Sequence, residues 1–456
     1  DSYVYLSGYS GGADVDLTVG GDVIVEVDDF YAFTLSGSSG DATLNVDGNF
    51  RLDSPNGSVF MTEGNGPATI NSLGDFDILN GVLANPGTGT ADVNFEGAVV
   101  HDFTNNGTIS NAVNFNVASL STLNLGTSTI TGSGEFNLNG GTLGVGSTQA
   151  SGALQPGSGG GNLRNTGTRF FDSGSTIIYN GTGPQFIGNG FPSGSNVNLT
   201  ISNTNNVTLS TSLDIVALST LNLAAGNIVI GTQTLTINGT LTGNGGLVGG
   251  PSSTLNIGGT GNFGTLTFSG TNELLNFTLN RTASGLVTLG GDLTVVGTFT
   301  QTAGDLAIAN NTFAISGNFS RTAGDLVVTN QSEVVVNGSG TLPSEVGLSG
   351  TELGTLTINR SGSTFTTNAS LDITNLNLTS GIFDNGTGIG ITSGGTITRN
   401  AGGSMTNSPN NTVNLYNVTY NVGSPTVTGP ELVTNVLSNL TKLGSSSVTL
   451  ANAIVV

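Results

Sequence analysis

Carboxylates are the side chains of this sequence best suited to chemistry, and they concentrate near its beginning. Of the 29 Asp and Glu residues, 16 precede residue 116, and the pairs Asp14/Asp16 and Asp28/Asp29 bring hard oxygen ligands close together. Calcium ions bound between neighbouring segments would relieve the repulsion among such groups. The alternative is a solvated acidic face. We favour that interpretation, because the sequence lacks the glycine-rich nonapeptide of calcium-binding β-rolls.

Other candidate catalytic groups are few. His101 is the single histidine, so neither a Ser-His-Asp triad nor a multi-histidine metal site can form. Asp102 beside it would suggest an acid–base pair, but we expect a surface histidine. Asp305 and Asp325 lie 20 residues apart in two Ala-Gly-Asp-Leu segments, where a turn-forming Asp is the ordinary explanation. We therefore predict no enzymatic activity, no cofactor and no metal site beyond the calcium candidates.

Residues 259–264 have the glycine spacing of a dinucleotide-binding fingerprint. A strand-like segment, residues 265–268, follows where a helix would have to receive the pyrophosphate. In a chain with 73 glycines we interpret this match as coincidence.

Composition limits the function further. The formal net charge is −21, and eight Lys and Arg residues are too few for a surface that neutralises phosphates, so we exclude nucleic-acid binding. The chain has no Cys, which excludes disulfides and thiolate metal sites. It also lacks an apolar run of about 18 residues, so no membrane-spanning helix is expected. Hydrophobic residues make up 36% of the chain, which indicates a packed core.

The elements that must position these groups are repeats. Residues 297–316, GTFTQTAGDLAIANNTFAIS, return 20 residues later as GNFSRTAGDLVVTNQSEVVV, with runs of Phe, Ile, Val and Thr typical of strands. A unit this short buries its apolar face only by stacking on its neighbours. It therefore indicates one coil of a solenoid.

Near the N-terminus a related repeat recurs at spacings of 29, 26 and 23 residues. Because side chains alternate along a strand, we predict one set of residues inside the coils and the adjacent set exposed and in line. The inner set is Val15, Leu44, Ile70 and Val93, and the outer set is Asp16, Asn45, Asn71 and Asn94.

A longer repeat organises the rest of the chain. Its landmarks, residues 175–179, 253–257, 332–336 and 411–415, are offset by 78, 79 and 79 residues, and the Gly-rich residues 155–161 are predicted to be a bulging loop. We predict an all-β fold, a single elongated, right-handed parallel β-helix with coils of about 20 residues, or 23–29 near the N-terminus. Residues 1–115 form its acidic part, and residues 116–456 continue it in super-repeats that break off, as expected for a section of a longer polypeptide.

The repeats STIIYNGTGPQFIG and NLTISNTNNVTLSTSLDI, together with ATLNVDGNFRL and ATINSLGDFDI nearer the N-terminus, resemble the long repetitive cell-surface proteins of Bacteroidota. The resemblance implies a secreted, adhesin-like β-helical protein exported by the type IX route.

From these observations we expect an extracellular structural or adhesive protein at the cell surface, a component of a stalk, fibre or sheath. Its partners would be surface glycans or copies of itself in an oligomer or filament. The alternative is a carbohydrate-binding or carbohydrate-active β-helix module. An exposed aromatic platform would favour that alternative, and Tyr179, Tyr416 and Tyr420 are its candidate residues.

Overall fold

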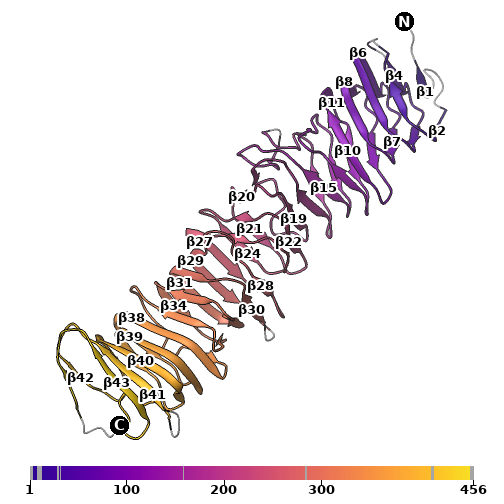
Figure 1. The fold of residues 1–456 in the computed structure, drawn as a ribbon. Helices are drawn as coiled ribbons and strands as arrows, with labels where there is room; N and C mark the ends of the chain where they lie inside the picture. Colours follow the sequence, from indigo (N-terminus) through magenta and orange to yellow (C-terminus); the bar gives the residue numbers. More distant parts are fainter. Residues whose placement is uncertain are drawn as a thin grey trace. The chain divides into compact units, whose positions relative to one another are not determined.

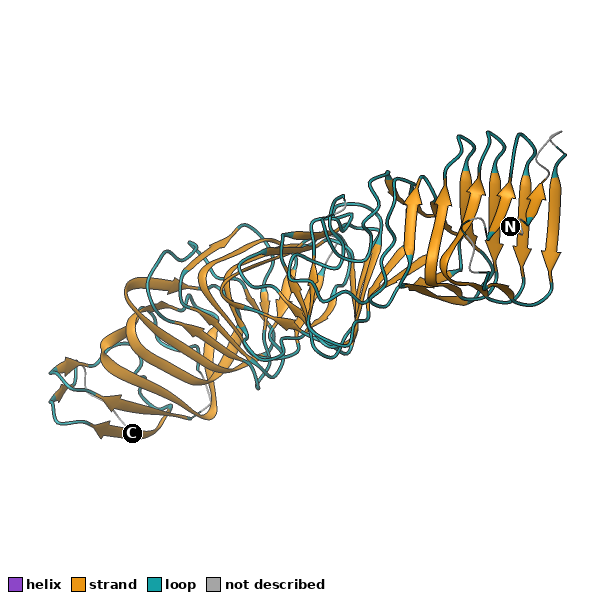
Figure 2. Ribbon diagram, turned by 90° about the horizontal axis from the view of Figure 1, so that it is seen from above, coloured by secondary structure: helices purple, strands orange, loops and turns teal. Residues whose placement is uncertain are grey.

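Residues 4–7, 13–27, 30, 32–157, 159–282, 285–411 and 415–451 are described by a computed structural model. These residues form strands and no helix. Parallel sheets stack as a β-solenoid of about 19 turns with coils of about 22 residues, which confirms the predicted parallel β-helix (Figures 1 and 2). The handedness of the coils stays a prediction.

The chain divides into two units. The first comprises residues 1–229 and 239–245, and the second comprises residues 230–238 and 246–456.

The first unit contains a seven-stranded parallel sheet that carries the candidate site. In spatial order its strands are β16 (Arg169–Phe171), β14 (Phe136–Leu138), β12 (Asn114–Val117), β9 (Ala91–Phe95), β7 (Ala68–Ser72), β5 (Ala42–Val46) and β2 (Val15–Val19).

The other strands of this unit complete the coils. A larger sheet contains β1 (Tyr5–Ser7), β3 (Val23–Val25), β4 (Phe33–Ser36), β6 (Phe50–Thr62), β8 (Phe76–Asn85), β10 (Val100–Asn105), β11 (Thr108–Asn111), β13 (Thr122–Asn124), β15 (Thr142–Val145), β17 (Thr176–Tyr179), β19 (Asn198–Ser202), β22 (Thr220–Ala225) and β25 (Thr240–Gly243). Shorter strands are β18 (Gln185–Ile187), β20 (Val207–Leu209), β21 (Leu213–Ile215) and β23 (Ile228–Val229). Strand β6 pairs with both β3 and β4, so one long strand contributes to two faces of its coil.

The second unit has a long sheet of β24 (Thr234–Ile237), β27 (Gly250–Ile257), β29 (Glu273–Asn280), β31 (Leu293–Ala303), β33 (Thr312–Ile315), β34 (Asn318–Arg321), β36 (Glu333–Val336), β38 (Glu352–Thr366), β39 (Leu371–Asp384), β40 (Ile389–Met405), β41 (Tyr416–Asn421) and β43 (Leu437–Leu443). Its remaining strands are β26 (Leu247–Val248), β28 (Gly264–Leu266), β30 (Leu286–Leu289), β32 (Asp305–Ala307), β35 (Leu326–Val327), β37 (Leu348–Ser349), β42 (Thr426–Val427) and β44 (Val448–Thr449).

The 20-residue repeat is one coil of the second unit. Phe299 pairs with Phe319, and Leu306 pairs with Leu326 in the neighbouring coil. Equivalent side chains therefore stack inside, and the rings of Phe299 and Phe319 lie 4.8 Å apart. Gly317, which begins the second copy, approaches the first so closely that a Cβ there would lie 1.8 Å from the Gly297 carbonyl oxygen. Only glycine avoids that overlap.

The N-terminal register follows the prediction for three of the four inner residues. Leu44, Ile70 and Val93 lie in line and are buried. Val15 is the exception, because it pairs with Ala42 and Leu17 takes the place opposite Leu44. A slip of two residues keeps every side chain on its face, so alternation alone cannot detect it.

The outer set is in line for Asn45, Asn71 and Asn94, but these residues are half-buried, and only Asp16 is fully exposed. Asp16 lies opposite Thr43, because the same two-residue slip moves it out of the asparagine row.

Buried serines recur in both units, and three of the four sequence landmarks begin with one of them, at Ser175, Ser253 and Ser332. Each hydroxyl donates a hydrogen bond to a backbone carbonyl oxygen 22 to 37 residues earlier in the chain. The pairs are Ser121 with Gly97, Ser175 with Leu138, Ser219 with Ser195, Ser253 with Gly231 and Ser332 with Ala309.

Truncation of the buried Leu306 to Ala should lower the free energy of unfolding by about 2–5 kcal/mol, because it leaves a cavity between stacked coils. Urea unfolding measures the change. The matched control is Leu218→Ala, since that side chain is 81% exposed and its loss should change stability by less than about 0.5 kcal/mol. Equal effects of the two substitutions would contradict the packing described here.

Candidate functional site

Four neighbouring strands of the seven-stranded sheet, β9, β12, β14 and β16, present a polar outer surface that we call the amide face. Asn116 donates a hydrogen bond from Nδ2 to Oδ1 of Asn94 at 2.8 Å, and Asn137 donates to Asn116 at 2.7 Å. The row continues through Asn71 and Asn45 in the preceding coils, at 2.8 and 2.7 Å. Parallel in-register pairing causes this arrangement, because it places equivalent side chains one coil apart.

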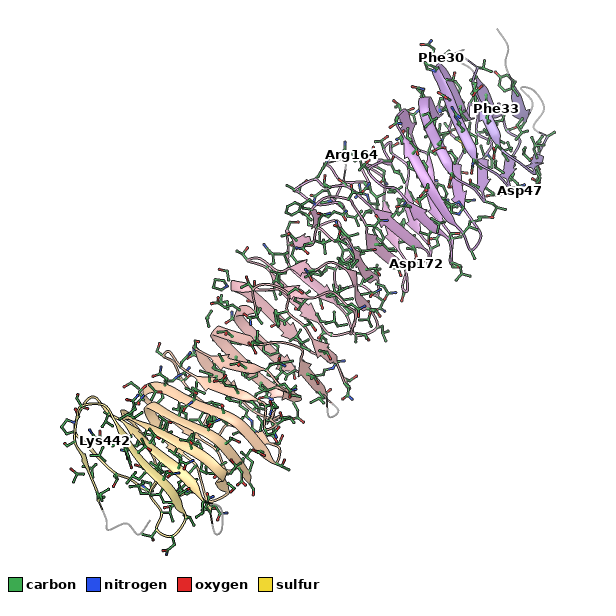
Figure 3. All side chains as sticks on the ribbon, viewed as in Figure 1. Phe30, Phe33, Asp47, Arg164, Asp172 and Lys442 are labelled. Atoms are coloured by element: carbon green, nitrogen blue, oxygen red, sulfur yellow. The ribbon has the colours of Figure 1, made fainter. Side chains whose placement is uncertain are left out.

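A second row runs beside the first and consists of Glu96, Ala118, Asn139 and Asp172 (Figure 3 labels Asp172). Its alignment follows from backbone bonds of Ala118 N–H to Phe95, Asn139 N–H to Val117 and Asp172 N–H to Leu138, at 3.0, 2.9 and 3.0 Å. The methyl group of Ala118 is small. It leaves a hollow of about 320 Å³ bordered also by Asn94, Glu96, Asn116 and Asn139.

The amide row ends at an aromatic ring. Phe170 pairs with Asn137, so it takes the next position in the row, and its side chain is 48% exposed. Asn137 Oδ1 has no hydrogen-bond partner among the described residues, because a phenyl ring cannot donate to it as the next asparagine would.

An amide side chain can both donate a hydrogen bond to a hydroxyl group and accept one from it. Asn71 and Asn94 each use one N–H and one oxygen lone pair for their neighbours in the row and keep one of each, whereas Asn116 also donates to Asp92 Oδ1 at 3.4 Å. Glu96 is the one carboxylate that lines the hollow, whereas glycoside hydrolysis requires two carboxyl groups that flank the bond to be cleaved. This geometry suits binding.

All eight Lys and Arg residues lie in the described ranges, and each binds a carbonyl or carboxylate oxygen of its own chain. The pairs are Arg51 with Asp53, Arg164 with Gly161, Arg169 with Gln155, Gly157, Leu163 and Asn165, Arg281 with Gly258, Thr260 and Gly261, Arg321 with Gly324 and Asp325, Arg360 with Ile315, Gly317 and Asn337, Arg399 with Gly403 and Glu431, and Lys442 with Gly444. Burial lowers the pKa of Arg169, Arg281 and Arg360.

The match to a dinucleotide fingerprint is an arginine-binding turn. Arg281 donates from Nε to the Gly261 carbonyl at 2.6 Å and from Nη2 to the Thr260 carbonyl at 2.9 Å. Its guanidinium also lies 5.2 Å from the centre of the Phe263 ring. Residues 258–261 thus direct carbonyl oxygens at a cation, whereas a phosphate cradle directs N–H groups at an anion.

The prediction of a surface histidine is wrong. His101 is fully buried, with Nδ1 2.8 Å from the Gly74 carbonyl oxygen and Nε2 3.1 Å from that of Glu96. Strand alternation turns it inward, where it packs edge-on against Phe95. Asp102 points to the other face and accepts a bond from Asn124, so the two residues do not form an acid–base pair.

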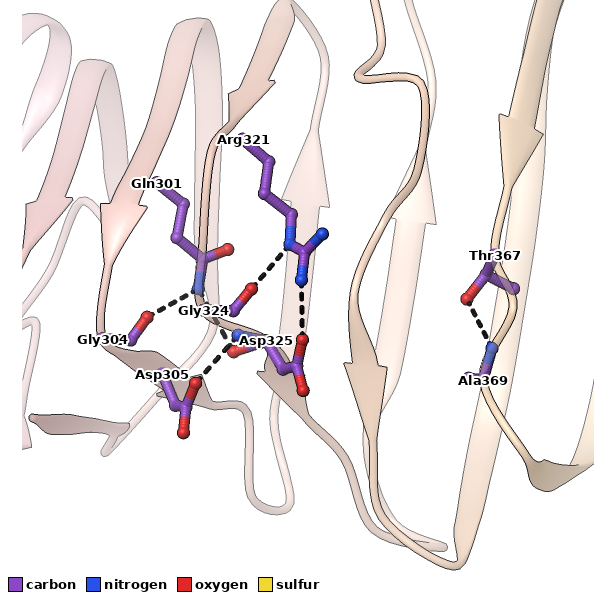
Figure 4. A network of polar contacts seen from close by, with 8 residues as sticks. All are labelled: Gln301, Gly304, Asp305, Arg321, Gly324, Asp325, Thr367 and Ala369. Atoms are coloured by element: carbon purple, nitrogen blue, oxygen red, sulfur yellow. Dashed lines mark hydrogen bonds and ion pairs between the residues drawn. The ribbon is translucent and has the colours of Figure 1, made fainter. Parts of the chain in front are cut away.

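Asp305 and Asp325 stack one coil apart, as expected, and both stabilise the turn between their coils (Figure 4). Asp325 N–H donates to Asp305 Oδ1 at 2.8 Å, and Arg321 pairs with the Asp325 carboxylate at 2.8 Å. Gln301 donates to the Gly304 carbonyl in the same turn at 2.9 Å.

The three tyrosines named as a possible platform are all buried, so none of them is an exposed aromatic surface. Their positions in β17 and β41 face inward. Tyr416 donates to the Glu431 carbonyl oxygen at 2.9 Å and Tyr420 to Glu431 Oε1 at 2.5 Å, beside Arg399. The large apolar rings exposed in the described residues are instead Phe30 and Phe170.

Two of the four calcium candidates, Asp14 and Asp16, lie within the described residues. Asp14 and Asp16 are exposed, and each already accepts a hydrogen bond, from Asp41 N–H at 3.1 Å and from Asn45 Nδ2 at 2.6 Å. Asp28 and Asp29 lie outside the described residues. Within the described part of the chain, no group of three or more His, Cys, Asp or Glu residues could hold a metal ion.

Comparisons of the chain with protein families, with curated proteins and with solved structures found no match. In the described ranges, no helix is long and apolar enough to span a membrane. The class that the structure defines is therefore that of the β-solenoids.

Addition or chelation of calcium should leave the melting temperature unchanged within about one degree, because a bound ion would stabilise only the folded state and no described cluster could hold it. Melting curves with excess EDTA and with millimolar calcium test this. An increase of many degrees in calcium would instead assign bridging ions to the acidic coils.

Alkaline pH should destabilise the protein through its buried tyrosines. Burial raises the pKa of Tyr416 from 10 to about 12, and it also raises the pKa values of Tyr179 and Tyr420. The folded state thus retains phenol protons that the unfolded chain loses. Stability is complete below pH 10 and should fall as pH rises from 10 to 12, by about 1.4 kcal/mol per pH unit for each tyrosine.

Two substitutions distinguish the contributions of Tyr179 and Tyr420 to stability. The Tyr179 hydroxyl has no partner among the described residues, so Tyr179→Phe should be neutral or stabilising at pH 7 and should reduce the alkaline loss. Tyr420→Phe removes the donor to Glu431 and should cost about 1–3 kcal/mol at pH 7. Identical denaturation midpoints for the two variants would refute these assignments.

Proposed function

We propose that this chain is an extracellular structural or adhesive protein of the cell surface, a component of a stalk, fibre or sheath. One observation carries the proposal: all eight basic side chains, and the asparagine, serine and aspartate rows, bind neighbouring parts of the same chain. Arg281, Arg360 and Arg399 reach residues 20 to 45 positions away and so join coils, as the asparagine row and the buried serines do, whereas Arg51, Arg164, Arg321 and Lys442 stabilise local turns. Each added coil increases length without requiring a new chemical group.

Two further properties support a location outside the cell. Eight Lys and Arg residues in 456 give trypsin-like proteases few cleavage positions. The backbone of the strands is paired from coil to coil, and paired backbone is protected from cleavage until it opens. The resemblance to secreted Bacteroidota surface proteins agrees with this proposal, and with export by the type IX route.

The alternative is a carbohydrate-binding or carbohydrate-active module. The amide face favours binding, because it combines a row of amides, a hollow beside Ala118 and an exposed ring at Phe170. A binding surface is compatible with an adhesive protein. The partners are then surface glycans, further copies of the chain, or both.

Deletion of the gene tests the proposal in the living cell. We expect reduced surface attachment or loss of surface filaments, with unchanged growth on polysaccharides. The reason is that the proposed protein would extend from the cell and contact other surfaces, and would not degrade polysaccharides. The measurements are adhesion assays, electron microscopy of the envelope and growth curves, each compared with a complemented strain. Normal adhesion and ultrastructure with lost growth on one glycan would favour a carbohydrate-active enzyme instead.

A further inference from the structure

We infer that the amide face binds a neutral glycan chain, which lies along the stacking direction of the coils with one sugar ring on Phe170. The inference rests on the proposed adhesive function and names the ligand class and the surface. It depends on three features of the described residues: the aligned amides, the exposed ring and the charges around them.

The aligned amides supply hydrogen-bonding groups in successive coils: Asn94 keeps one N–H and one oxygen lone pair, Asn116 keeps an oxygen lone pair, and Asn137 keeps one N–H. Asn94, Asn116 and Asn137 succeed one another at the coil spacing of about 4.8 Å, which is similar to the length of one hexose in an extended glycan. A chain of sugars along this row therefore meets an amide at each residue. The hollow beside Ala118 admits substituents that project from the chain toward the sheet.

Phe170 supplies the apolar contact that hydroxyl-rich ligands need for affinity. Its ring follows Asn137 in the same row and is 48% exposed. The negative face of an aromatic ring attracts the polarised C–H groups of a sugar face. Binding sites of this kind combine apolar or aromatic surface with a few well-placed polar groups, as here.

The charges select a neutral ligand. Asp92, Glu96, Glu135 and Asp172 border or lie on the face, and their carboxylates accept strong hydrogen bonds from hydroxyl groups. Arg169, on the same strand as Phe170, directs its guanidinium to the carbonyls of Gly157, Leu163 and Asn165. Uronic acids and sulfated glycans would therefore meet repulsion with no compensating cation. The chain's formal charge of −21 likewise opposes a second copy as the occupant.

Titration calorimetry of the purified full chain tests the inference. The probes are hexasaccharides of β-1,4-glucose, β-1,4-N-acetylglucosamine, β-1,3-glucose and α-1,4-glucose, with oligogalacturonate as the anionic control. We expect at least one neutral probe to bind and the anionic probe to bind roughly tenfold more weakly or not at all.

Two variants locate the binding surface. Phe170→Ala should weaken binding roughly tenfold, and Ala118→Leu should weaken it comparably by filling the hollow while it removes no contact. Phe170→Tyr should retain binding. Leu218→Ala, which truncates an 81% exposed side chain between β21 and β22, outside the seven-stranded sheet, is the matched control and should bind as the parent chain does. Unchanged melting curves would show that each variant is folded.

Failure of all neutral probes, tighter binding of oligogalacturonate, or full binding by both Phe170→Ala and Ala118→Leu would overturn the inference. These results would not affect the proposed structural role, which is measured separately by attachment and surface ultrastructure. Conversely, binding to a neutral glycan in a protein whose deletion leaves attachment and filaments unchanged would retain this inference and reject the proposed function.

Discussion

The structure depends on hydrogen bonds between the backbones of successive coils. A single coil of about 22 residues leaves its strand N–H and C=O groups unpaired, and these groups are satisfied only when the next coil lies parallel and in register. In-register stacking also decides which side chains meet. Each outward residue lies one coil spacing from its equivalents, so the residue at each position must be compatible with those at the equivalent positions of the adjacent coils.

Asparagine meets this requirement better than aspartate does. An amide can donate to one neighbour and accept from the other, which is how Asn45, Asn71, Asn94 and Asn116 form a continuous row. A row of carboxylates would repel at the same spacing. The aspartates of these coils accordingly accept bonds from amide groups, as Asp92 does from Asn114 at 3.0 Å. The acidic composition of the first unit is therefore compatible with close stacking without metal ions.

The same constraint acts inside the turns, where buried carbonyl oxygens need donors. Serines supply single bonds, whereas Arg360 reaches carbonyls of Asn337 and of Ile315 and Gly317 farther back in the chain. A guanidinium group bound in this way links successive coils through hydrogen bonds. The outer surface changes from amide to aromatic where the amide row ends at Phe170. This residue lies in β16, which follows the connection of residues 146–168 from β15. An aromatic ring there ends the repeating chemistry of the row and offers an apolar contact to a ligand.

The sequence by itself determined the strand alternation, the coil length and the parallel stacking, because period-two patterning and a 20-residue repeat are local properties of the chain. It also determined which face Leu44, Ile70 and Leu306 occupy. Tertiary structure decided the rest, since a slip of two residues moved Val15 without changing its face, and only the packed coil shows that His101, Tyr179, Tyr416 and Tyr420 lie inside. The distant partners of Arg281 and Arg360 and the position of Phe170 beside Asn137 were likewise hidden, because each joins residues 20 to 45 positions apart whose pairing is set by coil register and inserted loops.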